Sequence, residues 1–489
     1  MTLRLQKKST LLANFAAYAT GNFAQQATNF LLLFVLARFL SPRDIGITGT
    51  LAVYSAVISI IMMLQLNGAV SRFYWKYKED AARLNTYTGS IWVFQMALAT
   101  LITGFLALWP GWWEAWQAYK PLAQRIAFWP AVPLAMSGIL FVAGVSVPLA
   151  LLQAREEATT YVKISLSRLI ISGPLSFVLV AGFGMGAVGI LLAQSIAGLF
   201  VLSHVLIKYH HACFPARFNF DDVKEALTFS FPLVPHALAA WILMSADRAV
   251  LERYSDLVTV GAYGLAVTAS MCVESIASSI NSAWQPQYFR IMSHAGGCRA
   301  GIKRALIYYG LGYGLFCLVA ILFAGEVMSL LLPEKHHQAI SFIAPLLLAR
   351  LWGGWYYFAC TPLFFYQKTK IIPVITTLAG LVGLSLNLVL VPKFGAIAAA
   401  WNSVFTITLM TLMFQSASRR LDKLPFPWYP MLVVAGCCVC GSLLPQKFPV
   451  WSSPGFILKL MILAVAGVVC GFIFRVTMRM KDSPDAEFS

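Results

Sequence analysis

Long apolar stretches, separated by short polar loops, run through the whole of this 489-residue chain. A helix that crosses a bilayer needs roughly 20 mostly apolar residues. Helix breakers such as Ser41-Pro42 and Pro392 divide close neighbours into separate helices. The sequence predicts fourteen spans, at about residues 11–38, 44–66, 86–108, 126–150, 161–182, 187–207, 227–247, 258–282, 305–326, 339–362, 371–391, 396–416, 429–446 and 455–475. The fold class that this pattern indicates is an all-α polytopic membrane protein.

Composition supports lipid as the main solvent of the chain. Hydrophobic residues make up 59% of it and charged residues 11%, whereas soluble domains carry about 25% charged residues. The formal net charge of +17 would suit a nucleic-acid partner, but the basic residues are scattered through short loops without forming a stripe or patch. The sequence therefore predicts no nucleic-acid partner. It predicts no metal site either, because the C-x-x-C spacing of Cys437 and Cys440 has no second pair or histidine beside it.

The distribution of Lys and Arg predicts the orientation of the chain. Basic residues are retained on the cytoplasmic side of short loops, and a cytoplasmic N-terminus places most of the 36 in cytoplasmic loops. Both termini are therefore predicted to be cytoplasmic. The tryptophan-rich loop at residues 109–116 then lies outside, where its rings are predicted to form an interfacial belt. Lys459, at the start of the last span, is predicted to snorkel outward.

A short motif occurs twice in the chain. The segment VLARF at residues 35–39 is matched by VLERY at residues 250–254, and each is followed at the same distance by a glycine, Gly46 or Gly261. Each copy spans a predicted helix end, a tight loop and the next helix start, as expected of a duplication. The offset covers six spans, an even number, so the copies share one orientation and are related by an axis along the membrane normal. The predicted domains are a six-helix lobe at residues 1–207, a second lobe at 208–416, and a helix pair with a cytoplasmic tail at 417–489.

The loops leave no room for a catalytic domain. None of those predicted is long enough to fold as a domain, and the phosphate-binding pattern G-x-x-x-x-G-K-[ST] is absent. The glycine-rich segment at residues 182–186 falls at a helix hairpin with no strand before it. The chain is therefore predicted to move a substrate without transforming it, and not to be an enzyme.

Arginines inside or beside the predicted spans are candidates for the substrate path. A charged side chain at the bilayer centre costs at least about 2.5 kcal/mol, so it should face a cavity or a partner. Arg350 lies near the middle of its span and is predicted to line a hydrophilic cavity; the alternative is a buried pair with Glu274. Arg168 lies nearer the cytoplasmic side, and for it a cavity role and a structural role stand equal. Arg72, at the inner mouth of the second span, is either part of the cavity or an interfacial anchor.

The first span is unusually polar. Four amide side chains fall at i, i+3, i+4 and i+7, which places them on one face of a helix. A stripe of this kind lines a cavity or joins helices, and the cavity is the preferred interpretation. The four residues are Asn22, Gln25, Gln26 and Asn29.

Three further residues are candidates for ion coupling. A buried carboxyl and a histidine can both exchange a proton with a cavity. Glu274 and His236 lie within predicted spans, and Asp247 lies beside Arg248 at the outer end of the seventh. Hydrogen bonding within the fold is the alternative for His236, and interfacial anchoring is the alternative for Asp247. No cofactor is predicted beyond a coupling H⁺ or Na⁺.

Three segments resemble one family of transporters. They are LARFLSPRDIG at residues 36–46, VSRFY at residues 70–74, and the stretch from SADRAVL at 245–251 to VGAYGLA at 260–266. With fourteen predicted spans, paired lobes and a trailing helix pair, the chain resembles the polysaccharide biosynthesis branch, which includes O-antigen flippases, of the multidrug/oligosaccharidyl-lipid/polysaccharide (MOP) exporter superfamily.

The resemblance implies two helical bundles that give alternating access to a lipid-linked glycan. The substrate that it implies is an oligosaccharide joined to undecaprenyl diphosphate, moved from the cytoplasmic to the periplasmic leaflet of the bacterial inner membrane. Guanidinium groups would replace water around the diphosphate, and the amides of the first span would bind sugar hydroxyls. Membrane lipids and other polysaccharide assembly proteins are the further partners that it implies.

Two other functions stay open at this point. A multidrug antiporter of the same superfamily would need acidic residues to hold organic cations, whereas these spans carry few carboxylates and more arginine. A non-transporting scaffold of a polysaccharide synthase complex would share the fold without needing charges in the membrane. The residues do not distinguish O-antigen, capsule, exopolysaccharide or a common antigen as the cargo.

Overall fold

The computed structural model describes residues 24–26, 28–121, 124–215, 217–293, 299–421, 428–443 and 453–479. In these residues every regular element is a helix and no strand is present, which confirms the all-α fold class. Twelve helices of the described part are long and apolar enough to cross a membrane, and two shorter apolar helices, Ala24–Ala37 and Met431–Leu443, accompany them. Each predicted span overlaps one of these helices, while the count of fourteen spans stays a prediction.

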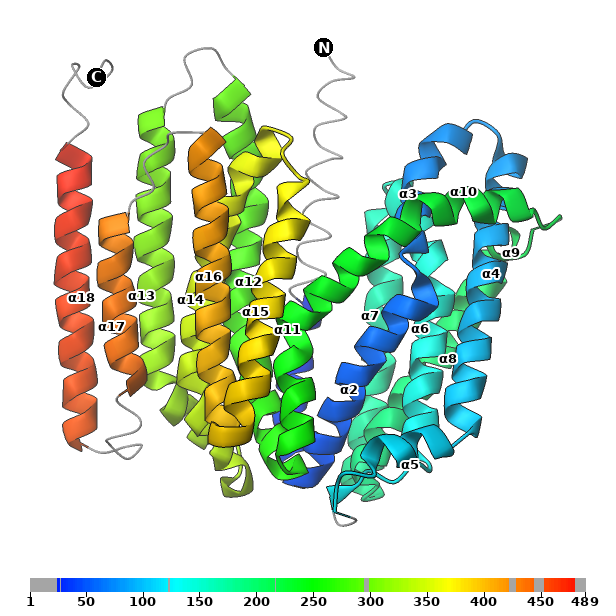
Figure 1. Cartoon of the computed structure of the whole chain (residues 1–489), viewed down its shortest axis with the longest axis horizontal. Coiled ribbons are helices and arrows are strands. Elements are labelled where there is room, and N and C mark those ends of the chain that lie inside the picture. Colours follow the sequence, from blue (N-terminus) through cyan, green and yellow to red (C-terminus); the bar gives the residue numbers. More distant parts are fainter. Residues whose placement is uncertain are drawn as a thin grey trace. The chain divides into compact units, whose positions relative to one another are not determined.

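The chain packs as two compact units, Met1–Gly261 and Ala262–Ser489. The first unit contains α2 to α11 and the first residues of α12 (Figure 1). Its helices are α2 Pro42–Met63, α3 Leu66–Tyr77, α4 Ala81–Leu108, α5 Gly111–Gln117, α6 Ala131–Ala154, α7 Ala158–Phe177 with a π-helical turn at Val178–Gly182, α8 Gly186–Lys208, α9 His210–Cys213, α10 Phe220–Ser230 and α11 Val234–Tyr254. The predicted lobes at residues 1–207 and 208–416 follow from the repeat and stay a prediction.

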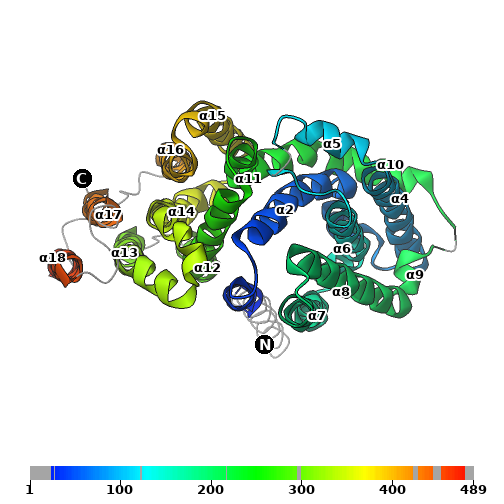
Figure 2. The same ribbon diagram turned by 90° about the horizontal axis from the view of Figure 1, so that it is seen from below.

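The second unit contains the rest of α12 and the helices that follow it. They are α12 Leu257–Ser293, α13 Arg299–Leu331, α14 Ile340–Phe365, α15 Ile371–Phe394, α16 Ala396–Leu421, α17 Trp428–Leu443 and α18 Ser453–Arg479. α14 packs against α13 and α16, and α15 packs against α16. α17 and α18 lie beside α13 (Figure 2). Gly310 and Gly314 of α13 leave the space that Met431 and Val434 of α17 occupy, so α17 packs closely on this unit.

Lys459 of α18 does not snorkel outward as predicted. Its side chain is buried and forms an ion pair with Glu326 of α13. A buried ammonium needs such a counter-charge, because removing it from water is otherwise costly. α18 is therefore joined to α13 by an ion pair as well as by apolar contacts.

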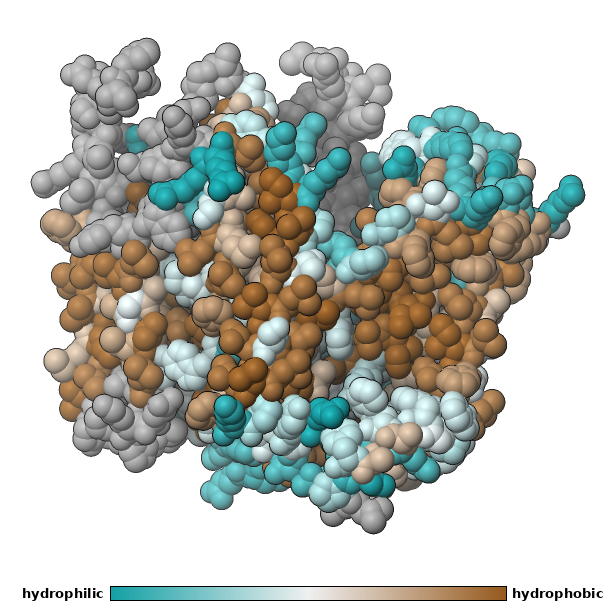
Figure 3. All heavy atoms as spheres, viewed as in Figure 1, coloured by the Kyte–Doolittle hydropathy of each residue, from teal (hydrophilic) through white to brown (hydrophobic). Residues whose placement is uncertain are grey.

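Apolar side chains cover the middle of the helices, and polar side chains gather at their ends (Figure 3). Large apolar residues on helices that can cross the membrane are widely exposed, for example Leu101 at 72%, Phe105 at 55% and Phe472 at 66%. In water such exposure would be unfavourable. Lipid chains are the solvent that suits these surfaces.

The SPRD segment at residues 41–44 forms a capping box at the start of α2. The Asp44 amide donates to the Ser41 hydroxyl, and the Ser41 amide donates to the Asp44 carboxylate, both at 3.1 Å. Reciprocal caps of this kind satisfy amides that a helix N-terminus leaves unpaired. The Asp44 carboxylate also accepts from the Ala187 amide at the start of α8, at 3.1 Å. This part of the motif therefore begins one helix and ties it to a second.

The tryptophan-rich loop folds as the short helix α5 and is not wholly interfacial. Trp109 and Trp116 are 53% and 48% exposed, as a belt requires. Trp113 is instead 2% exposed, and its indole donates to the Ile126 carbonyl at 2.9 Å. It packs among buried residues of α2, α4 and α6. The belt prediction is wrong for Trp113, because a large ring whose N–H finds an acceptor is stable in the core.

The two copies of the repeat meet at a glycine crossing. Each copy precedes the start of a helix, as predicted: α2 in the first and α12 in the second. A Cβ on Gly46 would lie 1.9 Å from the Leu257 carbonyl oxygen, and a Cβ on Gly261 would lie 2.6 Å from the Pro42 carbonyl oxygen. Pro42 and Leu257 are themselves equivalent positions of the repeat, so the contact is reciprocal. Only glycine permits backbones to approach this closely.

Replacing Gly46 by alanine is expected to lower the free energy of unfolding by about 1–3 kcal/mol, because the added methyl group must displace the backbone of α12. Gly261→Ala is expected to act in the same direction. Thermal unfolding of the purified variants in detergent measures the effect. Gly49→Ala is the matched control, since Gly49 lies one turn further along α2 and faces open space. Equal losses for the Gly46 and Gly49 variants would contradict the crossing.

Candidate functional site

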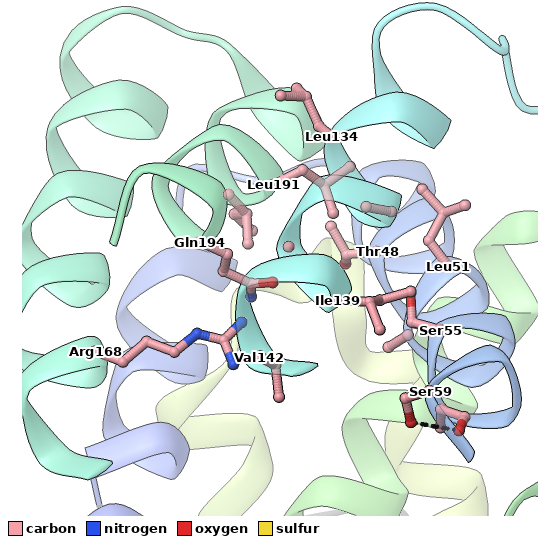
Figure 4. Close-up of a pocket in the computed structure, with 15 residues that line it drawn as sticks. Thr48, Leu51, Ser55, Ser59, Leu134, Ile139, Val142, Arg168, Leu191 and Gln194 are labelled. Carbon is pink, nitrogen blue, oxygen red and sulfur yellow. Dashed lines mark hydrogen bonds between the residues drawn. The ribbon is translucent and has the colours of Figure 1, made fainter. Parts of the chain in front are cut away.

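A cavity lies among α2, α6, α7 and α8 of the first unit (Figure 4). Its volume is about 280 Å³. Most of its wall is apolar, and none of the residues that line it is acidic. Its polar side chains are Thr48, Ser55 and Ser59 from α2, Arg168 from α7 and Gln194 from α8. The cavity is therefore largely apolar, with one positive charge and a few hydroxyl and amide groups on its wall.

Arg168 supplies the positive charge of this cavity. It lies midway along α7, and its guanidinium reaches into the cavity on the side of Gln194 (Figure 4). Within the described part of the chain it forms no ion pair and no hydrogen bond. An unpaired charge at this depth is costly unless an anion or water solvates it. Arg168 is therefore the residue of this cavity best suited to hold an anion.

Three hydroxyls of α2 complete the polar wall. Thr48, Ser55 and Ser59 are spaced seven and four residues apart, which places them on one helical face. The Thr48 hydroxyl donates to the Asp44 carbonyl at 3.1 Å, and the Ser59 hydroxyl donates to the Ala56 carbonyl at 2.7 Å. A hydroxyl rotates freely and can donate to a ligand instead. The sequence analysis missed these three hydroxyls. Their spacing of seven and four residues within an apolar span was the available signal.

Arg350 is paired inside the second unit. Its Nη1 lies 2.5 Å from the Glu274 carboxylate, and its Nε donates to the Ser270 hydroxyl at 3.1 Å. The Tyr313 hydroxyl donates to the Arg350 carbonyl at 2.9 Å. The pair with Glu274 was the structural alternative to a cavity role, and the structure contains that pair. A contact between Arg350 and substrate, and a coupling role for Glu274, stay predictions.

The other predicted site residues that the structure describes do not line the cavity around Arg168. Gln25 is half-buried on the first helix, whereas Gln26 and Asn29 are exposed; Asn22 lies outside the described residues. The Arg72 guanidinium stacks over the Phe229 ring, 4.6 Å from its centre.

The two remaining coupling candidates lie on α11. The Nδ1 atom of His236 is buried without a hydrogen-bond partner in the described residues. The Asp247 carboxylate accepts from the Arg248 amide at 2.7 Å. Ion coupling through either residue stays a prediction.

A buried ion pair elsewhere in the first unit escaped the sequence analysis. The Lys120 ammonium, in the loop after α5, lies 2.6 Å from the Glu252 carboxylate in the last turn of α11, and the two side chains are 3% and 2% exposed. The Tyr54 and Tyr119 hydroxyls also donate to this carboxylate, at 2.8 and 3.0 Å. Burial first, and the Glu252 charge second, raise the pKa of Tyr119, so it remains a donor at any physiological pH. Glu252 occupies the repeat position of Ala37, and this charge in place of a methyl group was the available signal.

The comparison with known proteins agrees with the resemblance. The sequence matches the profile of the polysaccharide biosynthesis protein family over residues 11–292. A protein of the Lsg locus of Haemophilus influenzae is 20% identical over 415 residues, which cover 83% of this chain and 98% of that protein. The lipid II flippase MurJ, in an inward closed conformation, has a TM-score of 0.75 at 12% identity, over 94% of this chain and 99% of its own. An inward-facing multidrug resistance MATE family transporter of the MOP superfamily has a TM-score of 0.62 at 14% identity, over 82% of this chain and 95% of its own.

At such low identities the two solved structures establish the fold, which is that of MOP superfamily transporters. With its twelve long apolar helices among the described residues, the chain is a multi-pass protein of the bacterial inner membrane. The profile covers more than half of the 489 residues, and on that match the chain belongs to the polysaccharide biosynthesis protein family.

Proposed function

We propose that this chain is a flippase that moves an undecaprenyl-diphosphate-linked oligosaccharide from the cytoplasmic to the periplasmic leaflet. The observation that carries the proposal is Arg168, which has no ion-pair partner among the described residues and faces a cavity with three hydroxyls and no acidic side chain in that part of the chain. The family and the fold support it. The finer architecture belongs to the same proposal: fourteen spans, two six-helix lobes that alternate access, a C-terminal helix pair, and both termini in the cytoplasm.

The chemistry of the cavity suits the head of such a lipid. A diphosphate is multiply charged and cannot enter hydrocarbon without replacing its water. A guanidinium offers several N–H donors in a planar fork that matches phosphate oxygens. The hydroxyls of α2 and the Gln194 amide then bind sugar hydroxyls, while the prenyl tail stays in lipid. Arg350, Arg72 and the amides of the first span extend this path in the proposal.

Ion coupling is a further part of the proposal. Glu274, whose carboxylate lies 2.5 Å from the Arg350 guanidinium, is one candidate for the coupling residue. His236, whose Nδ1 atom is buried without a hydrogen-bond partner in the described residues, is a second candidate. A protonophore that stops translocation would identify H⁺ as the driving ion. If translocation continues, a Na⁺ gradient or the consumption of glycan outside the membrane would be the energy source.

Translocation by the purified protein tests the proposal. The protein is reconstituted into vesicles that carry a fluorescent polyprenyl-diphosphate glycan, and a membrane-impermeant quencher reports the leaflet of the label. Transfer well above that of protein-free vesicles is the expected result. Uptake of an organic cation without glycan transfer would show the antiporter instead, and transfer of neither would leave the scaffold role.

A further inference from the structure

We propose that the exposed groove between α7 and α8 binds the phosphate of an anionic phospholipid in the cytoplasmic leaflet. This groove encloses a pocket of about 310 Å³, separate from the cavity around Arg168. The pocket is lined by Thr160, Lys163 and Ser167 from α7 and by Phe200, His204 and Lys208 from α8. The site does not depend on the proposed transport function.

The pocket is strongly basic. Two lysine ammoniums and an imidazole line it, and no acidic residue does. Neither Lys163 nor Lys208 forms an ion pair or hydrogen bond within the residues that the structure describes. Two uncompensated charges that face one concavity repel each other. A bound phosphate relieves this repulsion and accepts hydrogen bonds from both.

Helix geometry places these groups on one face of each helix. Phe200, His204 and Lys208 are spaced four residues apart on α8, and Thr160, Lys163 and Ser167 share one face of α7. α7 begins at Ala158 and α8 ends at Lys208, so the basic groups gather at the same end of this packed pair. Lys163 lies five residues into α7, about 8 Å along its axis at 1.5 Å per residue. This distance is comparable to the thickness of the headgroup region of a bilayer, at the end predicted to be cytoplasmic.

Exposed apolar side chains beside the pocket favour a lipid over a soluble anion. Ile196, Phe200 and Ile207 of α8 are 44%, 60% and 80% exposed. They lie on a helix long and apolar enough to cross the membrane. An acyl chain can pack along this face while its phosphate occupies the basic pocket. A soluble phosphate would use the charges and leave the apolar face without a role.

Lipid retention tests this site. The full-length protein is reconstituted in nanodiscs that contain phosphatidylglycerol or, separately, neutral phosphatidylcholine. Native mass spectrometry then counts the lipid molecules that stay bound to the released protein. Lys163→Gln/Lys208→Gln is expected to lower the affinity for phosphatidylglycerol about thirtyfold. Each lysine near an anionic lipid surface contributes roughly 1 kcal/mol of binding free energy, and the variant loses two. The control, Lys368→Gln/Lys370→Gln, removes two exposed lysines of the α14–α15 loop and is expected to bind as the wild type does.

Three outcomes would overturn the proposal. Equal retention by both double variants would show that these lysines bind no lipid phosphate. Displacement of the lipid by millimolar inorganic phosphate would show a site for soluble anions. Selective retention of polyprenyl diphosphate in place of phosphatidylglycerol would assign the groove to the transport substrate. Thr160→Val/Ser167→Ala is a second variant with the charges intact, and a severalfold loss is expected from it.

Discussion

Replacing Lys120 by methionine is expected to lower the free energy of unfolding by about 3–5 kcal/mol, the cost of leaving a buried charge without its partner. Glu252 would keep two hydroxyl donors, from Tyr54 and Tyr119, but would lose the ammonium at 2.6 Å. Hydrogen bonds from neutral hydroxyls do not compensate a full charge at 2% exposure. Thermal and denaturant unfolding of the purified variant in detergent measures the loss.

Two controls separate burial from charge loss in this experiment. Lys78 and Glu79 form an exposed ion pair, with side chains 37% and 88% exposed. Lys78→Met breaks this pair and is expected to lower the free energy of unfolding by at most about 1 kcal/mol. Lys120→Met/Glu252→Gln removes both buried charges and keeps an acceptor for the tyrosines, so it is expected to recover most of the loss. A Lys120 variant as stable as the Lys78 variant would show that the pair is solvated.

Replacing Arg168 by glutamine is expected to reduce glycan translocation at least about tenfold, because a hydrogen bond to a charged group contributes about 1.5–3 kcal/mol. Stability should remain unchanged or rise, since the removed charge has no partner in the described residues and is costly in an apolar bundle. Arg168→Lys keeps the charge without the planar fork and should retain part of the activity. Reconstituted translocation and thermal unfolding, measured on the same preparations, check both expectations.

The combination of lost transport and retained stability is what identifies a ligand-binding arginine. A structural arginine would lose both together. Arg155→Gln is the matched control, since Arg155 is exposed at the C-terminal end of α6 and does not line the cavity. Translocation by the Arg168→Gln variant at the wild-type rate would remove this residue from the substrate path.

The helices were predictable because their signal is local. An apolar run of sufficient length must be a helix in lipid, whatever lies beside it, and the predicted spans accordingly overlap the helices observed. The capping box at residues 41–44 and the two glycine-bearing helix starts could also be predicted from the chain alone. These features depend on residues close together in the sequence.

Partnerships between distant residues could not be predicted in the same way. Arg350 could have faced water or Glu274 with the same sequence, because the choice depends on how α12 and α14 pack. The partner of Lys120 lies 132 residues further on, and only the packing of the α5 loop on α11 brings the two together. Arg168 differs from both because no described residue is its partner. Only the packing of the helices therefore distinguishes Arg168 from the charges that have counter-ions.

The glycine crossing has the form of a contact between two identical subunits. In a symmetric dimer, the same residue of each subunit makes the same contact with its partner. Gly46 packs against Leu257, and Gly261 packs against Pro42, the position equivalent to Leu257. An ancestral six-helix chain that paired with its own copy would have needed a single glycine codon to form both sides. After gene fusion the two codons could diverge, yet each still packs against backbone that tolerates no Cβ. The reciprocity of the crossing is thus the geometry that duplication of a self-pairing chain would produce.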